Sequence, residues 1–323
     1  MSKFIGRLAD VGIAKESVRG TAETTASYWL PKQSMSYDDT IEQIVDESSV
    51  GVIEDSPNAV VIGKSGEGEI EGNIYDDSFG LLLLSALGSV STSGPSQSTV
   101  YTHTFSTSQS AQHPALTIFL DDPNQDYKYA LAMISQLDVD IALGQFAKFN
   151  AQFRSKVGAT ATLSPSYTVK NHFLPQHGSV KIASAVAGLG AASAIDVRSV
   201  KLSINKNIED DRKLGSVDPA DILNKQFSIE GSLELVFNAE TFKTEMLADT
   251  AQAMRIRLTS SVTIGSSLNP QITIDLAKCK FSNFKKNYGN NDIVTATVDF
   301  KAFYSMTDTK MISVELINET SSY

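Results

Sequence analysis

Residues 66–88 read GEGEIEGNIYDDSFGLLLLSALG, and the hydrophobic period changes halfway along this stretch. Up to residue 74, glycine and isoleucine alternate with Glu67, Glu69 and Glu71, which predicts a strand with an apolar face and an acidic face. The second half opens with Asp and Ser, continues as a leucine-rich run and closes on glycine, which is typical of a short helix. The stretch therefore predicts a strand that leads directly into a helix.

Most other segments also alternate with period two and are rich in Val, Ile, Thr and Phe, as half-buried antiparallel strands are. The clearest of them are YTHTFST (101–107), ALTIFL (115–120), AMISQLDVDIAL (132–143), QFAKFNAQFRS (145–155), VRSVKLSINKN (197–207), FSIEGSLELVF (227–237), QITIDL (271–276) and IVTATVDFKAFYS (293–305). A second helix is predicted over residues 238–250 (NAETFKTEMLADT), where Asn238 is a favourable N-cap residue. We therefore expect a mainly β protein with two short helices.

The two strand-and-helix units indicate an internal duplication. Ile-Glu-Gly at 70–72 precedes the first helix, and Ile-Glu-Gly at 229–231 precedes the second, 159 residues later. Other matches follow in the same order: SMSYDD (34–39) with KLSINKN (201–207), LTIFL (116–120) with ITIDL (272–276), MISQL (133–137) with KFSNF (280–284), and FNAQF (149–153) with FKAF (300–303). Few residues are identical between the two halves, so the evidence for a duplication is mainly that the matches occur in the same order.

This duplication predicts a division of the chain. The expected parts are an N-terminal arm (1–27), a first copy (28–158), a Gly/Ala/Ser-rich linker or excursion (159–195), a second copy (196–308) and a C-terminal tail (309–323). Each copy is expected to be a small β-sandwich or partly closed barrel with one short flanking helix, because a sheet must bury its apolar face against another layer.

Composition excludes several classes of protein. The formal net charge of −10 argues against binding to phosphate backbones, which requires clustered Lys and Arg. The start lacks the apolar core of a secretory signal, and the longest apolar run, 79–87, is too short to span a bilayer of roughly 30 Å. The single cysteine, Cys279, is expected to be a small buried apolar residue. We expect a soluble chain without a membrane segment.

Two nucleotide-binding motifs fail by one position each. The sequence GKS at 63–65 resembles the end of a phosphate-binding loop, but Asn58 stands where the first glycine is required. In GEGEIEG the third position of a dinucleotide fingerprint is Glu71, and no strand–helix–strand unit surrounds it. The sequence therefore predicts no nucleotide cofactor.

Metal and catalytic motifs are equally incomplete. DDPNQDY at 121–127 has the start of an EF-hand, but Tyr127 and Met133 replace the required glycine and glutamate. His172 and His177 have no adjacent Cys or acidic ligand for zinc. Glu67, Glu69, Glu71, Glu230 and Glu234 form an outward-facing acidic set, interpreted as a solvated face. We therefore expect neither a metal nor catalysis.

The segment VGIAKESVRGTAETTASYWLPKQSMS (11–36) contains the pattern G-x-x-K-E-x-x-x-G-T-A. Its members are Gly12, Lys15, Glu16, Gly20, Thr21 and Ala22. This opening resembles that of tail tube proteins of long-tailed, siphovirus-type bacteriophages. The resemblance continues through the strand and helix at 66–88 and into YTHTF, so it covers most of the first copy; the second copy is matched only through the duplication.

The resemblance implies a structural subunit of a virion tail, assembled in the host cytoplasm. Its subunits join sheets edge to edge into rings, and the rings stack around a channel through which DNA passes during ejection without specific binding. Expected partners are the chain itself, together with tape measure, tail terminator and tail tip proteins. Because rings of single-domain tube proteins are six-fold, two tandem copies favour a trimeric ring over a hexameric one.

The same resemblance assigns contacts between stacked rings. Residues 38–64 are expected to form a long acidic loop, and loops of such length are usually functional. The candidate inter-ring residues are Lys15, Glu16 and Arg19 in the arm, and Glu42, Asp46, Glu47, Glu54 and Asp55 in the loop. The alternative for the loop is a mobile surface hairpin. For the acidic set of Glu67, Glu69, Glu71, Glu230 and Glu234, the resemblance leaves open a place on the channel wall, at a contact between subunits or on the outside.

Two other functions stay open at this point. A two-domain β-sandwich on a virion or cell surface would serve adhesion or carbohydrate binding and would expose aromatic platforms. A hydrolase would need a cleft with carboxylates of separated pKa. The single tryptophan, Trp29, argues against a sugar-stacking cleft.

Overall fold

A computed structural model describes residues 3–55, 58–168 and 170–323 of the chain. The α-helices are α1 (Phe79–Leu87) and α2 (Thr241–Leu247), and one-turn 3-10 helices are η1 (Gly6–Leu8), η2 (Pro175–His177) and η3 (Val186–Gly188). The strands of the first half are β1 (Asp10–Lys15), β2 (Tyr28–Leu30), β3 (Lys32–Asp46), β4 (Asn58–Asn73), β5 (Gly88–Ser96), β6 (Val100–Thr107), β7 (Leu116–Asp121), β8 (Tyr127–Ala142), β9 (Lys148–Ser155) and β10 (Ala159–Thr160). Those of the second half are β11 (Gly178–Ala183), β12 (Ala194–Ile195), β13 (Val197–Asn205), β14 (Ile208–Asp211), β15 (Asp221–Asn224), β16 (Ser228–Val236), β17 (Gln252–Thr259), β18 (Gln271–Asn287), β19 (Thr295–Ala302) and β20 (Ile312–Asn318). The prediction of a mainly β fold is confirmed.

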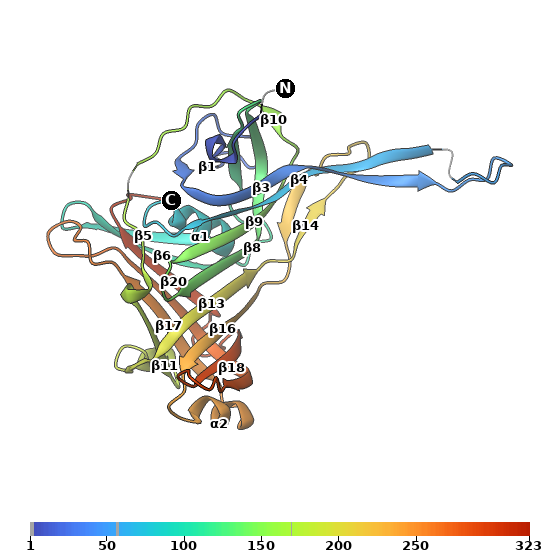
Figure 1. Cartoon of the computed structure of the whole chain (residues 1–323). Coiled ribbons are helices and arrows are strands. Elements are labelled where there is room, and N and C mark those ends of the chain that lie inside the picture. Colours follow the sequence, from blue (N-terminus) through green and yellow to red (C-terminus); the bar gives the residue numbers. More distant parts are fainter. Residues whose placement is uncertain (1–2, 56–57, 169) are drawn as a thin grey trace.

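One antiparallel sheet runs through both halves of the chain. Its strands follow the order β3–β4–β9–β8–β13–β16–β19–β18. Figure 1 shows β8, β13 and β16 side by side where the two halves meet. The inward residues of these strands, such as Ile70, Leu137, Leu202 and Leu233, are buried in one common core. We call this assembly the continuous sheet.

The long strands β8 and β18 each belong to two layers. The first half of β8 pairs with β7 and β10, and the first half of β18 pairs with β17 and β20. Beyond β7 lie β1 and β2, and beyond β17 lie β11 and β12. These strands form the second layer that covers the apolar face of the continuous sheet.

The pairing order in the second half repeats that in the first. In the first half Gly72 pairs with Phe149, and in the second half Gly231 pairs with Phe300. Both Phe rings occupy the space that a Cβ on the opposite glycine would need. The hairpin β5–β6 is extra in the first half, and the two-stranded sheet β14–β15 is extra in the second.

The strand pairing revises two of the sequence matches. FNAQF and FKAF occupy β9 and β19 in the same register, as predicted. LTIFL lies in β7 and ITIDL in β18, which are not corresponding strands. MISQL and KFSNF lie on corresponding strands but out of register, because the pairing sets Leu137 opposite Ala151 and Cys279 opposite Ala302. Strand sequences of this kind match one another equally well when one is shifted by two or more residues. The sequence matches therefore did not determine which residues correspond.

Three segments predicted to lie outside the copies are parts of the sheets. The arm contains β1, whose residues Val11 and Ile13 are fully buried, although residues 1–2 lie outside the described part. The linker contains β11, which pairs along β17, and the tail contains β20, which pairs with β18 and β6. Their alternation is short, so the sequence pattern did not distinguish them from connections.

The predicted loop over 38–64 is mostly a two-stranded ladder. Strands β3 and β4 continue their pairing as far as Asp46 and Asn58. Figure 1 shows this hairpin projecting far from the body of the protein. It exposes large apolar side chains, including Ile41, Ile44 and Val60. A ladder forms here because both sides of the turn are rich in β-branched residues, which favour strands.

The two helices differ in burial. Every residue of α1 is buried, whereas α2 contains no buried residue. Helix α1 packs on β8 and ends at Gly88, which adopts φ 91°. Helix α2 packs on the corresponding strand β18 at the far end of the second half (Figure 1). In the described residues, neither helix has the length and apolar character needed to cross a membrane.

Candidate functional site

The solvent-facing side of the continuous sheet carries only polar side chains at its centre. We call this surface the polar face. Its carboxylates are Asp38, Glu67, Glu69, Glu71, Asp138, Asp140, Glu230, Glu234 and Asp299. Its cations are Lys148, Arg154, Lys201, Lys280, Lys285 and Lys301. Carboxylates therefore outnumber cations on this face.

Cross-strand pairs organise the polar face. Glu67 forms an ion pair with Arg154, and Lys148 lies 3.5 Å from Glu71. In the second half, Lys301 donates to Glu230 at 2.6 Å. All five glutamates predicted as an acidic set lie on this face. Three of them have a cationic partner. The sequence did not predict these partners, because alternation within a strand indicates the face of a residue but not which residue of the neighbouring strand lies beside it.

The two halves are joined by direct pairing of β8 with β13. Leu137 opposes Ile204, Val139 opposes Leu202, and Lys201 lies 3.9 Å from Asp140 across the same ladder. This joint makes a continuous sheet out of two strand sets that have the same internal order. We call it the internal joint.

The continuous sheet ends in two open edges. Strand β3 pairs only with β4, and β18 pairs only with β19 beyond Cys279, among the described residues. An unpaired strand edge is a template for pairing with another chain. Sequence alternation indicates which side of a strand is buried but not which strand is outermost, so these edges were not predicted.

Glu16 of the arm is a buried structural residue. Its Oε1 accepts a hydrogen bond from Leu131 N and its Oε2 accepts one from Gly20 N, both at 2.6 Å. Both donors lie at positive φ, 58° for Leu131 and 79° for Gly20. Burial raises the pKa of Glu16, while these hydrogen bonds oppose the shift. The motif around Glu16 therefore stabilises two turns.

Arg19 connects the arm to the second half of the same chain. It donates to Asp221 Oδ1 at 2.8 Å, to Ile222 O at 2.6 Å and to the His113 carbonyl. Lys15 is exposed and donates to Tyr323 O at 3.3 Å. Glu16 and Arg19 thus form hydrogen bonds within their own chain, and their contact with a neighbouring ring stays a prediction.

The predicted inter-ring acids lie on or near the projecting hairpin. Glu42 near its base forms an ion pair with Arg212, which follows β14. Asp46 accepts a hydrogen bond from Ser48 N at 3.0 Å, and Glu47 follows it at the end of β3. Glu54 and Asp55 lie in the exposed turn segment. The turn is therefore acidic and contains apolar residues as well.

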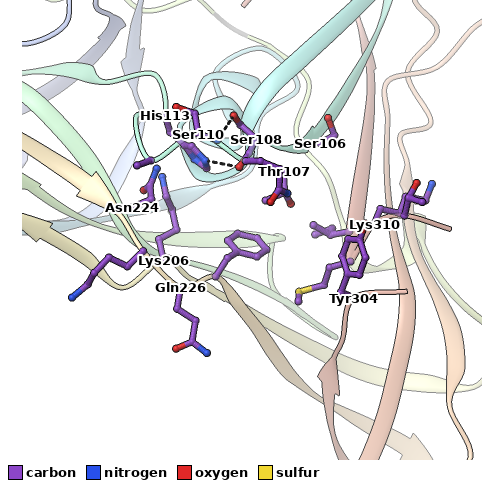
Figure 2. A pocket seen from close by; sticks show the side chains of 17 residues that line it. Ser106, Thr107, Ser108, Ser110, His113, Lys206, Asn224, Gln226, Tyr304 and Lys310 are labelled. Atoms are coloured by element: carbon purple, nitrogen blue, oxygen red, sulfur yellow. Dashed lines mark hydrogen bonds between the residues drawn. The ribbon is translucent and has the colours of Figure 1, made fainter. Parts of the chain in front are cut away.

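A cavity of about 760 Å³ lies beside the end of β6. Figure 2 shows His113, Lys206 and Asn224 on one side of it and Tyr304 and Lys310 on the other. Its lining contains no carboxylate. His113 Nε2 is bonded to the Ser108 carbonyl at 3.1 Å, and burial lowers the pKa of His113 to about 4. This lining lacks the hydroxyl–imidazole–carboxylate set of a hydrolase.

The remaining candidate motifs have structural roles. In the predicted turn, Asn124 N donates to Asp122 Oδ1 at 2.9 Å. Cys279 is fully buried, and burial raises the pKa of its thiol to about 12, which suppresses the reactive thiolate. No group of three or more His, Cys, Asp or Glu side chains in the described ranges is placed to hold a metal ion.

Comparisons with known proteins give one result about the family. No curated protein matches the chain. A family model described as phage tail tube protein matches residues 6–302. That range includes all strands from β1 to β19 and both helices. Because the match extends over most of the chain, this protein belongs to the phage tail tube protein family.

Proposed function

We propose that this protein assembles into stacked rings of a siphovirus-type tail tube and that DNA passes through their channel during ejection. Family membership supports a structural role in the virion tail. The observation that carries the ring is the continuous sheet with one open edge on β3 and the other on β18. Pairing of these edges between chains closes the sheet into a ring and removes both edges.

The internal joint supports a trimeric ring. Strands β3, β4, β9 and β8 correspond in pairing order to β13, β16, β19 and β18, so β8 and β18 have corresponding outer edges. Within a chain, the edge of β8 pairs with β13. The corresponding contact between chains is β18 with β3. Three chains then supply six copies, and the duplicated domains are the repeating units of the ring.

The polar face is proposed to line the channel. It carries an excess of carboxylates and no apolar platform at its centre. Duplex DNA is strongly anionic, so an acidic wall repels it and permits sliding, whereas a basic wall would hold it. Cross-strand pairs such as Arg154 with Glu67 keep the few cations of this face neutralised.

The projecting hairpin is proposed to contact the next ring. It exposes Ile41, Ile44, Val60 and other apolar side chains along a two-stranded ribbon. An isolated two-stranded hairpin is only marginally stable in water, so a neighbouring surface would stabilise it. In the virion we propose a tape measure protein inside the tube, a tail terminator at one end and tail tip proteins at the other, with assembly in the host cytoplasm.

Microscopy and native mass spectrometry test this proposal together. Negative-stain images of concentrated protein should show rings or hollow tubes, and isolated rings should have three times the chain mass of 34.8 kDa. Rings of six chains would contradict the trimer but keep the tube. Monomers at every concentration would instead favour an adhesive or carbohydrate-binding surface module.

A further inference from the structure

The segment before β11 has a specific place in the first half of the chain. Phe173 lies two residues before η2 and is fully buried. Its N donates to Ile74 O at 3.3 Å, and its O accepts from Ala147 N at 3.0 Å. Next to it, His172 bridges to Tyr75. The segment therefore adds a short strand between the end of β4 and the start of β9.

The segment before β1 resembles the segment before β11 in its local structure, but it does not pack into a neighbouring domain in the same way. Phe4 lies two residues before η1, which leads into β1 as η2 leads into β11. The sequences are Phe-Ile before η1 and Phe-Leu before η2. However, Phe4 is 57% exposed and Ile5 is 66% exposed. A free chain therefore exposes two adjacent large apolar side chains at its N-terminal segment.

The second half contains the matching acceptor positions. Phe237 directly follows β16 as Ile74 follows β4, and Val294 directly precedes β19 as Ala147 precedes β9. Phe237 N donates to Val294 O at 2.9 Å, as Ile74 N does to Ala147 O at 2.8 Å. Within the described chain, Val294 N and Phe237 O have no backbone partner. They are the groups that correspond to the two hydrogen-bonding partners of Phe173.

A cavity lies at the same position, and its lining combines apolar side chains with polar ones such as Asp196, Glu245 and Gln252. It has a volume of about 330 Å³, and its lining includes Leu235, Phe237, Phe242, Phe284 and Ala296. These residues come from the end of β16, from α2, from β18 and from β19. In the first half, the helix at this position, α1, is completely buried, whereas α2 is not. The described second half has no segment of its own chain at the position that the residues around Phe173 occupy in the first.

We propose that the N-terminal segment of a second copy of this chain fills this cavity. Phe4 of that copy lies beside α2 with its N–H donating to Phe237 O and its carbonyl accepting from Val294 N. Lys3 then lies opposite Asn238, as His172 lies opposite Tyr75. This contact accompanies the pairing of β18 with β3 and rests on the proposed ring.

Disulfide trapping tests the position of the segment. The double variant Lys3→Cys, Asn238→Cys should form a covalent bond between chains in the assembled fraction, because directly opposed residues on paired strands satisfy disulfide geometry. The matched control is Lys3→Cys with Leu214→Cys, because Leu214 is fully exposed on the loop between β14 and β15. Non-reducing electrophoresis should show linked chains only for the first pair.

A truncation tests the energetic role. Phe4→Ala should raise the concentration of half-assembly at least about tenfold, because the variant loses the burial of a large aromatic side chain between the chains. Leu214→Ala should leave that concentration unchanged, and both variants should unfold at the temperature of the parent chain. Suppose that the parent chain forms rings. Absence of the cross-link in Lys3→Cys, Asn238→Cys, or normal assembly of Phe4→Ala, would then overturn this contact but not the proposed ring. A parent chain that stays monomeric would overturn both.

Discussion

At the scale of single residues, the glycines of the two Ile-Glu-Gly motifs are packing positions. A Cβ on Gly231 would lie 2.5 Å from Phe300 Cζ and would also meet Lys201 O. A Cβ on Gly72 would lie 3.1 Å from the Phe149 ring and 3.3 Å from Pro31 O, which is tight but needs smaller shifts than at Gly231. The motif therefore leaves space for the aromatic ring of the opposite strand.

We predict that alanine at these glycines has unequal effects. Gly231→Ala should lower the free energy of unfolding by about 3 kcal/mol, because both backbone and ring must move. Gly72→Ala should cost only about 1 kcal/mol, because its contacts with the Phe149 ring and Pro31 O are longer and need only small shifts. Urea denaturation of both variants gives the comparison, and equal costs would contradict this account of packing.

Lys206 is the most unusual charged residue of the fold. It is 1% exposed, and its Nζ donates to Ser85 O at 2.6 Å. Burial, aided by nearby Arg19, lowers the pKa of Lys206 to about 7. Between pH 7 and its ordinary pKa near 10.5, the unfolded chain binds more protons than the folded chain. The free energy of unfolding should therefore rise with pH across this interval.

Replacing this lysine should remove that dependence. Lys206→Met should raise the free energy of unfolding at pH 7 by about 2 kcal/mol, because no ammonium group then has to be buried. The same variant should flatten the rise between pH 7 and pH 10. Lys225→Met is the control, because Lys225 is exposed beside Glu209. A parent-like pH profile in Lys206→Met would show that this lysine is not the source.

At the scale of elements, the corresponding helices perform different tasks. The leucines of α1 are inside the core, whereas Leu247 of α2 is 73% exposed. Leu83→Ala should cost about 2–5 kcal/mol in the free energy of unfolding, because it leaves a cavity. Leu247→Ala should change it by less than about 0.5 kcal/mol in the unassembled chain. Thermal unfolding of dilute samples measures both, and a large loss for Leu247→Ala would contradict the exposed position of α2.

The projecting hairpin should be dispensable for the fold but not for stacking. Replacing residues 44–60 by an Asn-Gly turn keeps the ion pair of Glu42 with Arg212 at the base. The thermal midpoint should stay within a few degrees of the parent value, because the removed described side chains are mainly exposed. Microscopy should then show single rings in place of tubes. Tubes of normal length would contradict a stacking role.

At the scale of the whole molecule, the sign of the net charge on the polar face should determine whether the protein binds or repels DNA. Reversing Glu69, Asp138 and Glu234 to lysine places cations along the proposed channel wall without breaking a carboxylate–cation pair. Tubes of this variant should bind short duplex DNA at low salt and release it as salt increases. Parent tubes should not bind it. Equal binding by variant and parent would place the polar face away from the channel.

The sequence by itself determined the local structure of this protein. Alternation in the strand of Glu67, Glu69 and Glu71 indicated which side is buried, and the leucine run indicated the helix, because both depend on neighbours within a few residues. The resemblance at Gly12, Lys15 and Glu16 indicated the family. It did not indicate that Glu16 is buried against Leu131, since that hydrogen bond joins residues far apart in the chain.

The tertiary structure decided which edges and acceptor sites stay open. Phe4 and Phe173 each precede one aliphatic residue and a one-turn 3-10 helix, yet one is exposed and the other fully buried. Likewise, β8 and β18 correspond in pairing order, but within the described residues β8 has another strand of the chain at its outer edge and the end of β18 has none. Long-range pairing distinguishes these positions, because a strand or side chain is covered only where the folded chain supplies a partner.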